Sequence, residues 1–215
     1  MLPGFPFGGL AAGGIEFVTS AAAFGATITI PAAAQAGDLA VLFDWSIQAS
    51  GPTSVIPAGW TQIGTDLSGA EGAVKHLASR KTLAAGEPGT SVTGMSGSLL
   101  TKQLLVFRPS AASAGTWGAT ASNNQVMASN TPPANQTVSV GAEPYIVLAS
   151  WGANIDIVTA GFSPTEDRQI GASGDRLVKF KIFNQSPAAV TVSCPGNPET
   201  SGWASLRSFR IPLVL

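Results

Sequence analysis

Few residues in this chain have the chemistry that a nucleophilic active site requires. The sequence contains one histidine, His76, and one cysteine, Cys194. A catalytic triad needs a histidine base beside an activated serine, and no Gly-x-Ser-x-Gly elbow occurs to pair with His76. His76 lies in a Val-Lys-His-Leu-Ala run typical of a strand, so we expect a strand-face histidine without a catalytic role. One histidine and one cysteine also cannot build a typical structural zinc site.

Carboxylates are the remaining route to hydrolytic chemistry. Glu166 and Asp167 are adjacent, and neighbouring residues of a strand point to opposite faces, so they do not form a glycosidase pair by themselves. Asp44, Asp66 and Asp156 could converge only through the fold, which leaves that alternative open. Asp44 interrupts an apolar run, and a buried carboxylate needs hydrogen-bond donors. We therefore expect Asp44 to make a structural hydrogen bond to a neighbouring loop.

No cofactor or metal motif is present. Asn154 and Asp156 offer two oxygen ligands for calcium but lack the twelve-residue pattern of an EF-hand. No glycine-rich phosphate loop with a lysine follows any candidate strand. Cys194 cannot form an intramolecular disulfide, and we expect a small buried side chain there. The sequence thus predicts a non-enzymatic protein with no catalytic residue, no metal and no cofactor.

The five tryptophans divide into two groups. Trp45 and Trp151 end apolar runs and Trp60 follows a proline turn, and their matching places in the two halves of the chain favour core packing. Trp117 and Trp203 each adjoin a glycine and are the candidates for contact with a partner or a glycan.

Composition narrows the classes of partner. Only 11% of the 215 residues are charged and the net charge is -1, whereas an average soluble domain is roughly 25% charged. A nucleic-acid interface needs a basic footprint, so nucleic acid is excluded as a partner. The low charge has two interpretations that stay open: alanine enrichment from a GC-rich genome, or a surface covered in an assembly. No apolar stretch reaches membrane-spanning length and no basic region precedes an apolar segment, so neither membrane insertion nor a secretion signal is expected.

The elements that must position these residues are strands. The 25 glycines and 15 prolines leave no room for a long helix. Alternating or continuous apolar runs separated by turn clusters predict strands at residues 26–30, 39–43, 104–107, 137–140, 145–149, 178–182 and 190–193. Short strands with frequent turns indicate an all-β antiparallel sandwich.

The two halves of the chain resemble each other. Gly59-Trp60 corresponds to Gly161-Phe162, and Phe107-Arg108 to Phe209-Arg210, with the same offset of 102 residues. This predicts pseudo-repeats over approximately residues 38–109 and 143–212. Two such halves closing on each other predict one jelly-roll-like sandwich domain, residues 15–215, with about eight strands.

Residues 1–14 form an apolar segment rich in glycine and proline, which cannot make a regular helix or a central strand. Its large side chains are Leu2, Phe5 and Phe7. We expect an extended anchor peptide that packs against its own domain or a neighbouring subunit.

Several short motifs resemble the β-sandwich modules of tailed-bacteriophage virion proteins, such as tail-fibre, tail-tip and head-decoration components. The similarity covers roughly residues 15–212, and its motifs are Gly-Asp-Leu-Ala-Val-Leu-Phe at 37–43, Ile-Pro-Ala-Gly-Trp-Thr at 56–61, Arg-Lys at 80–81, Gly-Glu-Pro at 86–88 and Leu-Val-Phe-Arg at 105–108. The resemblance carries no catalytic motif. It implies a virion structural protein, made in the cytoplasm of a host bacterium, whose partners are other virion proteins. It also implies a homotrimer attached to the particle through its N-terminal peptide. The alternative is a carbohydrate-binding module that recognises a bacterial surface glycan.

Overall fold

The computed structural model describes residues 14–47, 53–68, 74–97, 100–110, 115–129, 133–139, 141, 144–153, 161–163, 166, 168–170, 176–184, 189–193 and 203–215. Within these ranges the chain contains seventeen strands and no helix. Every strand pairing among them is antiparallel. The expectation of an all-β antiparallel fold is therefore confirmed, whereas the expected number of strands was too low.

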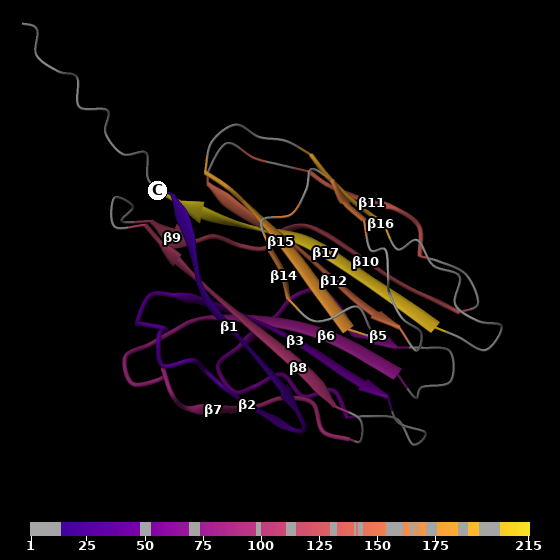
Figure 1. The fold of residues 1–215 in the computed structure, drawn as a ribbon, viewed down its shortest axis with the longest axis horizontal. Helices are drawn as coiled ribbons and strands as arrows, with labels where there is room; N and C mark the ends of the chain where they lie inside the picture. Colours follow the sequence, from indigo (N-terminus) through magenta and orange to yellow (C-terminus); the bar gives the residue numbers. More distant parts are fainter. Residues whose placement is uncertain are drawn as a thin grey trace, which may run out of the picture.

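The first half of the chain builds one large sheet in the order β1-β8-β3-β6-β4, with β5 also paired to β6 (Figure 1). Its strands are β1 (Ile15–Phe24), β3 (Leu39–Ile47), β4 (Thr61–Gln62), β5 (Leu67–Ser68), β6 (Val74–Thr82) and β8 (Thr101–Pro109). A smaller sheet pairs β2 (Thr27–Thr29) with β7 (Ser91–Thr93).

The second half builds a second large sheet in the order β10-β17-β12-β15-β14, with β9 paired to β17. Its strands are β9 (Thr116–Trp117), β10 (Ala121–Ser129), β12 (Tyr145–Ala153), β14 (Arg168–Ile170), β15 (Arg176–Phe183) and β17 (Trp203–Val214). Its smaller sheet has the order β11-β16-β13, from β11 (Gln136–Val138), β16 (Val190–Ser193) and β13 (Gly161–Ser163).

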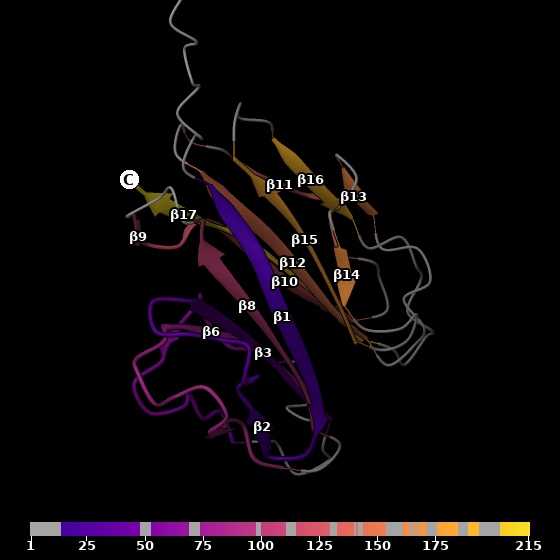
Figure 2. The same cartoon turned by 60° about the vertical axis from the view of Figure 1, so that its left-hand side comes forward.

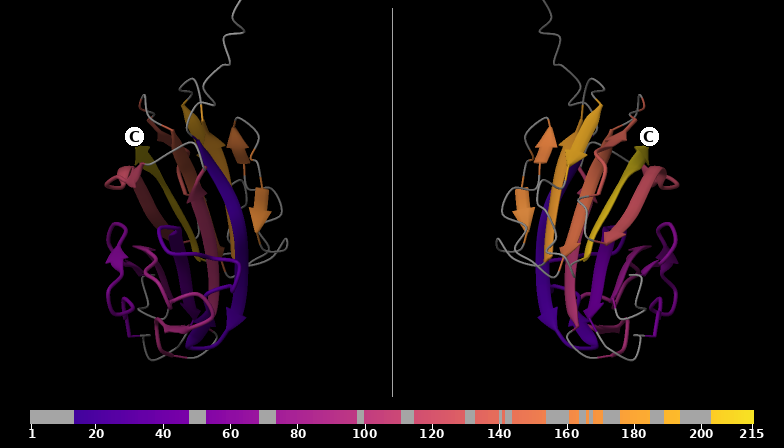
Figure 3. Two further views of the ribbon diagram at one scale, coloured as in Figure 1. Left: turned by 90° about the vertical axis from the view of Figure 1, so that its left-hand side faces the viewer. Right: turned by 90° about the vertical axis from the view of Figure 1, so that its right-hand side faces the viewer.

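The four sheets are stacked in layers, with the two large sheets in the middle (Figure 3). The central core lies between the large sheets and joins side chains such as Phe43 and Phe107 from the first half to Phe180 and Phe209 from the second. An outer core lies between each large sheet and its smaller partner. Each half therefore packs its large sheet on its own smaller sheet to form an outer core, and the two halves share the central core.

Strand alternation explains how one large sheet serves two cores. In β3, Leu39 and Val41 face the central core, whereas Ala40 and Leu42 face the outer core. Strands buried on both faces appear in sequence as continuous apolar runs rather than as alternating ones. This is why residues 39–43 and 145–149 show no periodicity.

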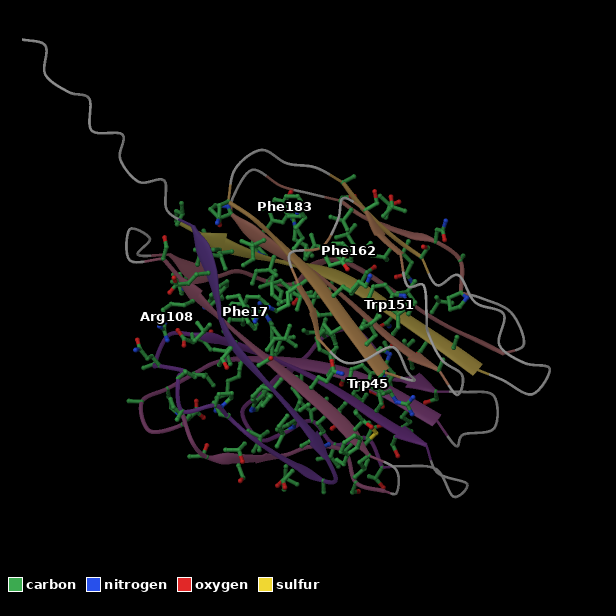
Figure 4. The ribbon with its side chains drawn as sticks, in the orientation of Figure 1. Phe17, Trp45, Arg108, Trp151, Phe162 and Phe183 are labelled. Atoms are coloured by element: carbon green, nitrogen blue, oxygen red, sulfur yellow. The ribbon has the colours of Figure 1, made fainter. Side chains whose placement is uncertain are left out.

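Trp45 and Trp151 are both completely buried, which confirms the expectation of core packing. They do not occupy matching places, however. Trp45 belongs to the central core and Trp151 to the outer core of the second half (Figure 4). Neighbouring side chains of a strand point to opposite faces of the sheet. A sequence alignment of the two halves that pairs Trp45 with Trp151 therefore differs from the structural correspondence by an odd number of residues.

The sequence analysis did not predict two long strands, β1 and β10. Both lie at an edge of their sheets. Most of β10 is alanine, serine and asparagine, and β1 contains three successive alanines. Alanine and asparagine are depleted in strands, so the pairing to β8 and β17 defines these strands. Figure 2 shows β1 running alongside β8 at the edge of the first large sheet. Phe17 of β1 also contacts the second half, since its ring centroid lies 5.0 Å from that of Phe180 in β15.

Candidate functional site

The polar side chains with unusual environments fall into three groups. The first is a cluster between the two large sheets, named here the inter-sheet cluster and composed of His76, Ser150, Ser205 and Arg207. The second is a buried ion pair between Asp44 and Lys102. The third, named here the N-terminal root, is the set of contacts that hold Gly14 and Ile15.

His76 lies on β6, and its side chain points into the space between the two large sheets. Its Nδ1 is 3.0 Å from Ser205 Oγ and its Nε2 is 2.9 Å from Ser150 Oγ. Ser205 Oγ donates in turn to the carbonyl of Gly152 at 3.2 Å, so it accepts from an Nδ1–H, and Ser150 donates to Nε2. This arrangement satisfies a neutral imidazole completely, and Trp45 covers its face with ring centroids 5.0 Å apart.

Burial is the main reason why His76 stays neutral. The side chain is completely buried, which disfavours the imidazolium and holds the pKa of His76 well below its usual range. The positive charges of Arg207 and Arg176 lower this pKa further. No described carboxylate offsets these effects at the ring nitrogens, because both bind serine hydroxyls.

Arg207 of β17 is the second member that ties the halves together. Its guanidinium is completely buried and donates to the carbonyls of Ile63, Thr65 and His76 at 2.6, 2.8 and 2.9 Å. Its fourth acceptor is Oε1 of Gln125 on β10 at 2.5 Å. Burial lowers the pKa of Arg207 to about 10, an effect that Asp66 partly opposes, so the group remains charged at neutral pH. One side chain of the second half thus satisfies three carbonyls of the first.

The inter-sheet cluster contains histidine–serine contacts but does not form an accessible nucleophile. His76, Ser150 and Ser205 are each 0% exposed. A substrate could reach a serine only if the two large sheets separated. The arrangement therefore holds the halves in register.

Asp44 on β3 and Lys102 on β8 form an ion pair beneath the loop that follows β7. Lys102 Nζ lies 2.5 Å from Asp44 Oδ2, and the backbone N–H of Met95 donates to the same oxygen at 2.7 Å. The expected hydrogen bond from Asp44 to a neighbouring loop is confirmed. Burial raises the pKa of Asp44, against the opposing influence of Lys102 and Met95, and it lowers the pKa of Lys102, against the opposing charge of Asp44.

The N-terminal root is held by both halves. Gly14 N–H donates to Ser110 Oγ at 2.9 Å, and Ser110 N–H donates to the Gly14 carbonyl at 2.7 Å, just beyond β8. Ile15 N–H donates to Oδ1 of Asn184 at 2.7 Å, just beyond β15, and Asn184 Nδ2 donates back to the Ile15 carbonyl at 3.2 Å. A Cβ on Gly14 would lie 2.9 Å from Asn184 Cγ, so this close approach requires glycine.

The predicted anchor residues Leu2, Phe5 and Phe7 lie outside the described residues. Trp203 begins β17, and its side chain is not among those described. Trp117 of β9 is half-buried against the central core, and its indole N–H donates to the Gly37 carbonyl at 3.0 Å. This hydrogen bond joins the two halves of the chain.

The carboxylates named as candidates do not form an acid–base pair where they are described. Glu166 pairs with Lys179 at 2.8 Å, and Asp66 accepts a hydrogen bond from Gln62 at 2.7 Å. Asp156, Asp167, Asn154 and Cys194 lie outside the described residues. Among the residues that are described, no three histidine, cysteine or carboxylate side chains gather as metal ligands.

The sequence analysis missed Lys102, Arg207 and Asn184. Lys102 could have been found from the sequence, because it interrupts an apolar segment just as Asp44 does. Buried charges need a partner, and opposite charges in two apolar segments are therefore expected to pair. Arg207 and Asn184 had none, since their partners are mostly backbone groups far away in the chain.

In the described part of the chain, no helix is both long and apolar enough to span a membrane. Comparison of the chain with protein-family models, with curated proteins and with solved structures gives no match in any of the three.

Proposed function

We propose that this protein is a non-enzymatic virion structural protein of a tailed phage or phage-like particle, attached through residues 1–14 and projecting its β-sandwich outward. The observation that carries the proposal is the N-terminal root. Gly14 and Ile15 are hydrogen-bonded to Ser110 in one half and to Asn184 in the other. A pull on the segment that precedes them would therefore be shared by both halves of the sandwich.

A fixed root also helps the anchor energetically. Burial of Leu2, Phe5 and Phe7 would contribute roughly 1.5–3 kcal/mol for each side chain. Ordering the peptide opposes this by about 1–2 kcal/mol for each residue. Since one end of the peptide is already held, the remaining loss of entropy is smaller. The balance for one copy is near zero or unfavourable, so stable attachment calls for several linked copies, as in the trimer that we propose.

We further propose that each half is a jelly roll and that the chain arose by internal duplication. The orders β1-β8-β3-β6 and β10-β17-β12-β15 correspond strand for strand when the second half is counted from β10. The smaller sheets β2-β7 and β11-β16 correspond in the same way. Superposition of residues 15–109 on residues 121–214 in an experimental structure should match these strands. A different strand order in either half would contradict the duplication.

Deletion of residues 2–10 tests the anchor. The truncated protein should fold with nearly unchanged melting temperature, because the N-terminal root begins at Gly14. Its copy number in purified particles, measured by quantitative mass spectrometry, should fall to background. Incorporation at the normal copy number would contradict the proposal. Failure to fold would also contradict it, because the peptide would then belong to the core of the domain.

Two matched variants refine this test. Asn184→Ala removes the tie between the root and the second half, whereas Ser163→Ala removes an exposed hydroxyl of β13. The first should reduce incorporation and the second should not. A titration of the full chain with host surface polysaccharide provides a further arm, since saturable binding would favour the receptor-recognition alternative.

A further inference from the structure

Asp44 and Lys102 are direct cross-strand neighbours. They face each other in the register of β3 and β8, on the side of the sheet away from the central core. The Lys102 side chain is 0% exposed and that of Asp44 is 4% exposed. Nζ lies 2.5 Å from Oδ2, so the amine is in direct contact with the carboxyl group.

The loop after β7 covers this pair. A Cβ on Gly94 would lie 2.3 Å from Asp44 Oδ2 and 3.0 Å from Lys102 Nζ, so only glycine permits the backbone to pack this closely. The Met95 N–H donates to Oδ2, and the Met95 carbonyl lies 3.4 Å from Nζ. The other carboxyl oxygen, Oδ1, is buried without a hydrogen-bond partner among the described residues. The ionised carboxylate is thus incompletely compensated.

We propose that Lys102 and Asp44 become joined by an intramolecular amide bond between Nζ and the side-chain carboxyl carbon. One proton first passes from the ammonium to the carboxylate and comes to lie on Oδ1, which gives a neutral amine and a carboxylic acid. The lone pair of Nζ then forms the bond to Cγ, and the developing oxyanion at Oδ2 accepts the Met95 N–H. The C–Oδ1 bond breaks, and a proton from Nζ leaves with that oxygen as water. No oxidant or other reactant is needed.

The surroundings reduce the free-energy cost of forming the neutral reactants, and they suit the amide product. Burial shifts the pKa values of both groups toward their uncharged forms, up for Asp44 and down for Lys102. The amide would remove two buried charges and the unpaired Oδ1 acceptor. Its N–H and C=O would have the Met95 carbonyl and N–H as partners, which are already in place.

Proximity alone does not predict this bond. Lys179 and Glu166 also form an ion pair, at 2.8 Å, but their side chains are 12% and 20% exposed. Lys81 and Glu87 are paired with exposures of 22% and 25%. Water reaches both of these pairs and solvates their charges, whereas the pair of Lys102 and Asp44 is shielded from it. They serve as controls within the same molecule.

The mass of the purified full-length protein under denaturing conditions tests the proposal. The expected mass is lower than the sequence mass by one water, with one amine fewer available to an acylating reagent after unfolding. Proteolysis and fragmentation should link a peptide with Asp44 to a peptide with Lys102, while Lys81 and Lys179 remain free. Lys102→Met and Asp44→Ala should each restore the mass that the variant sequence predicts.

The wild-type measurement decides the question even if both variants fail to fold. A full sequence mass with Lys102 acylated after denaturation would overturn the cross-link and leave a simple buried ion pair. Loss of water located elsewhere in the chain would overturn it as well. Neither result bears on virion attachment, which is tested separately by the deletion of residues 2–10.

Discussion

His76 should make the stability of this protein fall as the medium becomes acidic. In the folded chain the imidazole is buried between the large sheets with both nitrogens occupied, and its pKa is far below its usual value. In the unfolded chain it titrates near 6.5. Below that pH the unfolded state binds a proton that the folded state does not bind. Stability is therefore fully present above pH 6.5 and is lost as the pH falls below it.

The size of the effect follows from this difference in proton uptake. If His76 remains neutral in the folded state at pH 5, the change from pH 7 to pH 5 removes about 2 kcal/mol from the free energy of unfolding. This exceeds the effect of most single surface substitutions. In any chain where it remains a free carboxyl group, Asp44 contributes in the opposite direction, because a raised pKa gives stability that is present at low pH and lost as the pH rises through the folded value.

Comparison with the variant His76→Gln isolates the histidine. Glutamine can still bind a serine hydroxyl but does not titrate, and the carboxylates are the same in both proteins. Urea unfolding at pH 7 and at pH 5 should show the difference in stability between wild type and variant change by about 2 kcal/mol, with the wild type losing more.

The chain has one histidine, so its proton resonances can be assigned without ambiguity. In the folded protein they should not titrate between pH 7 and pH 5. A midpoint near 6.5 would refute the argument, because it would mean that water or a counter-charge reaches the ring. Equal pH dependence in wild type and His76→Gln would refute it independently.

Three further predictions concern the seam and the assembly. Gly152→Ala places a Cβ 2.6 Å from Trp45 Cδ1 and 3.0 Å from Ser205 Oγ. Urea titrations should therefore show a free energy of unfolding that is lower by about 1–3 kcal/mol. Unchanged stability would mean that the two large sheets can move apart freely. Arg207→Met leaves three buried carbonyls without their donor and should cost at least about 2 kcal/mol. Arg168 is exposed and its guanidinium lies 4.6 Å from the centre of the Phe17 ring, so Arg168→Met should cost only about 0.5–1 kcal/mol. Similar losses for the two variants in calorimetry would argue against the role of Arg207. Light scattering of the purified protein should give three times the chain mass, and a concentration-independent monomer would contradict the trimer.

Much of the strand content follows from local pattern. The runs at 39–43, 104–107, 145–149 and 190–193 all lie in strands, because β-branched and apolar residues between glycine and proline turns have few other stable conformations. The hydrogen bond of Asp44 was predictable for a similar reason, since a carboxylate inside an apolar run must find a donor nearby.

Tertiary structure alone decided how many layers the strands make and which face each side chain occupies. Trp45 and Trp151 end similar apolar runs, yet they enter different cores, because a run buried on both faces carries no periodicity to show its orientation. The alanine- and serine-rich strands β1 and β10 exist because β8 and β17 offer them partners. The roles of Arg207 and Asn184 depend on backbone carbonyls and amides that every residue carries, so no side-chain pattern along the chain could reveal them. Residue types thus determined which segments become strands, and long-range packing determined how those strands meet.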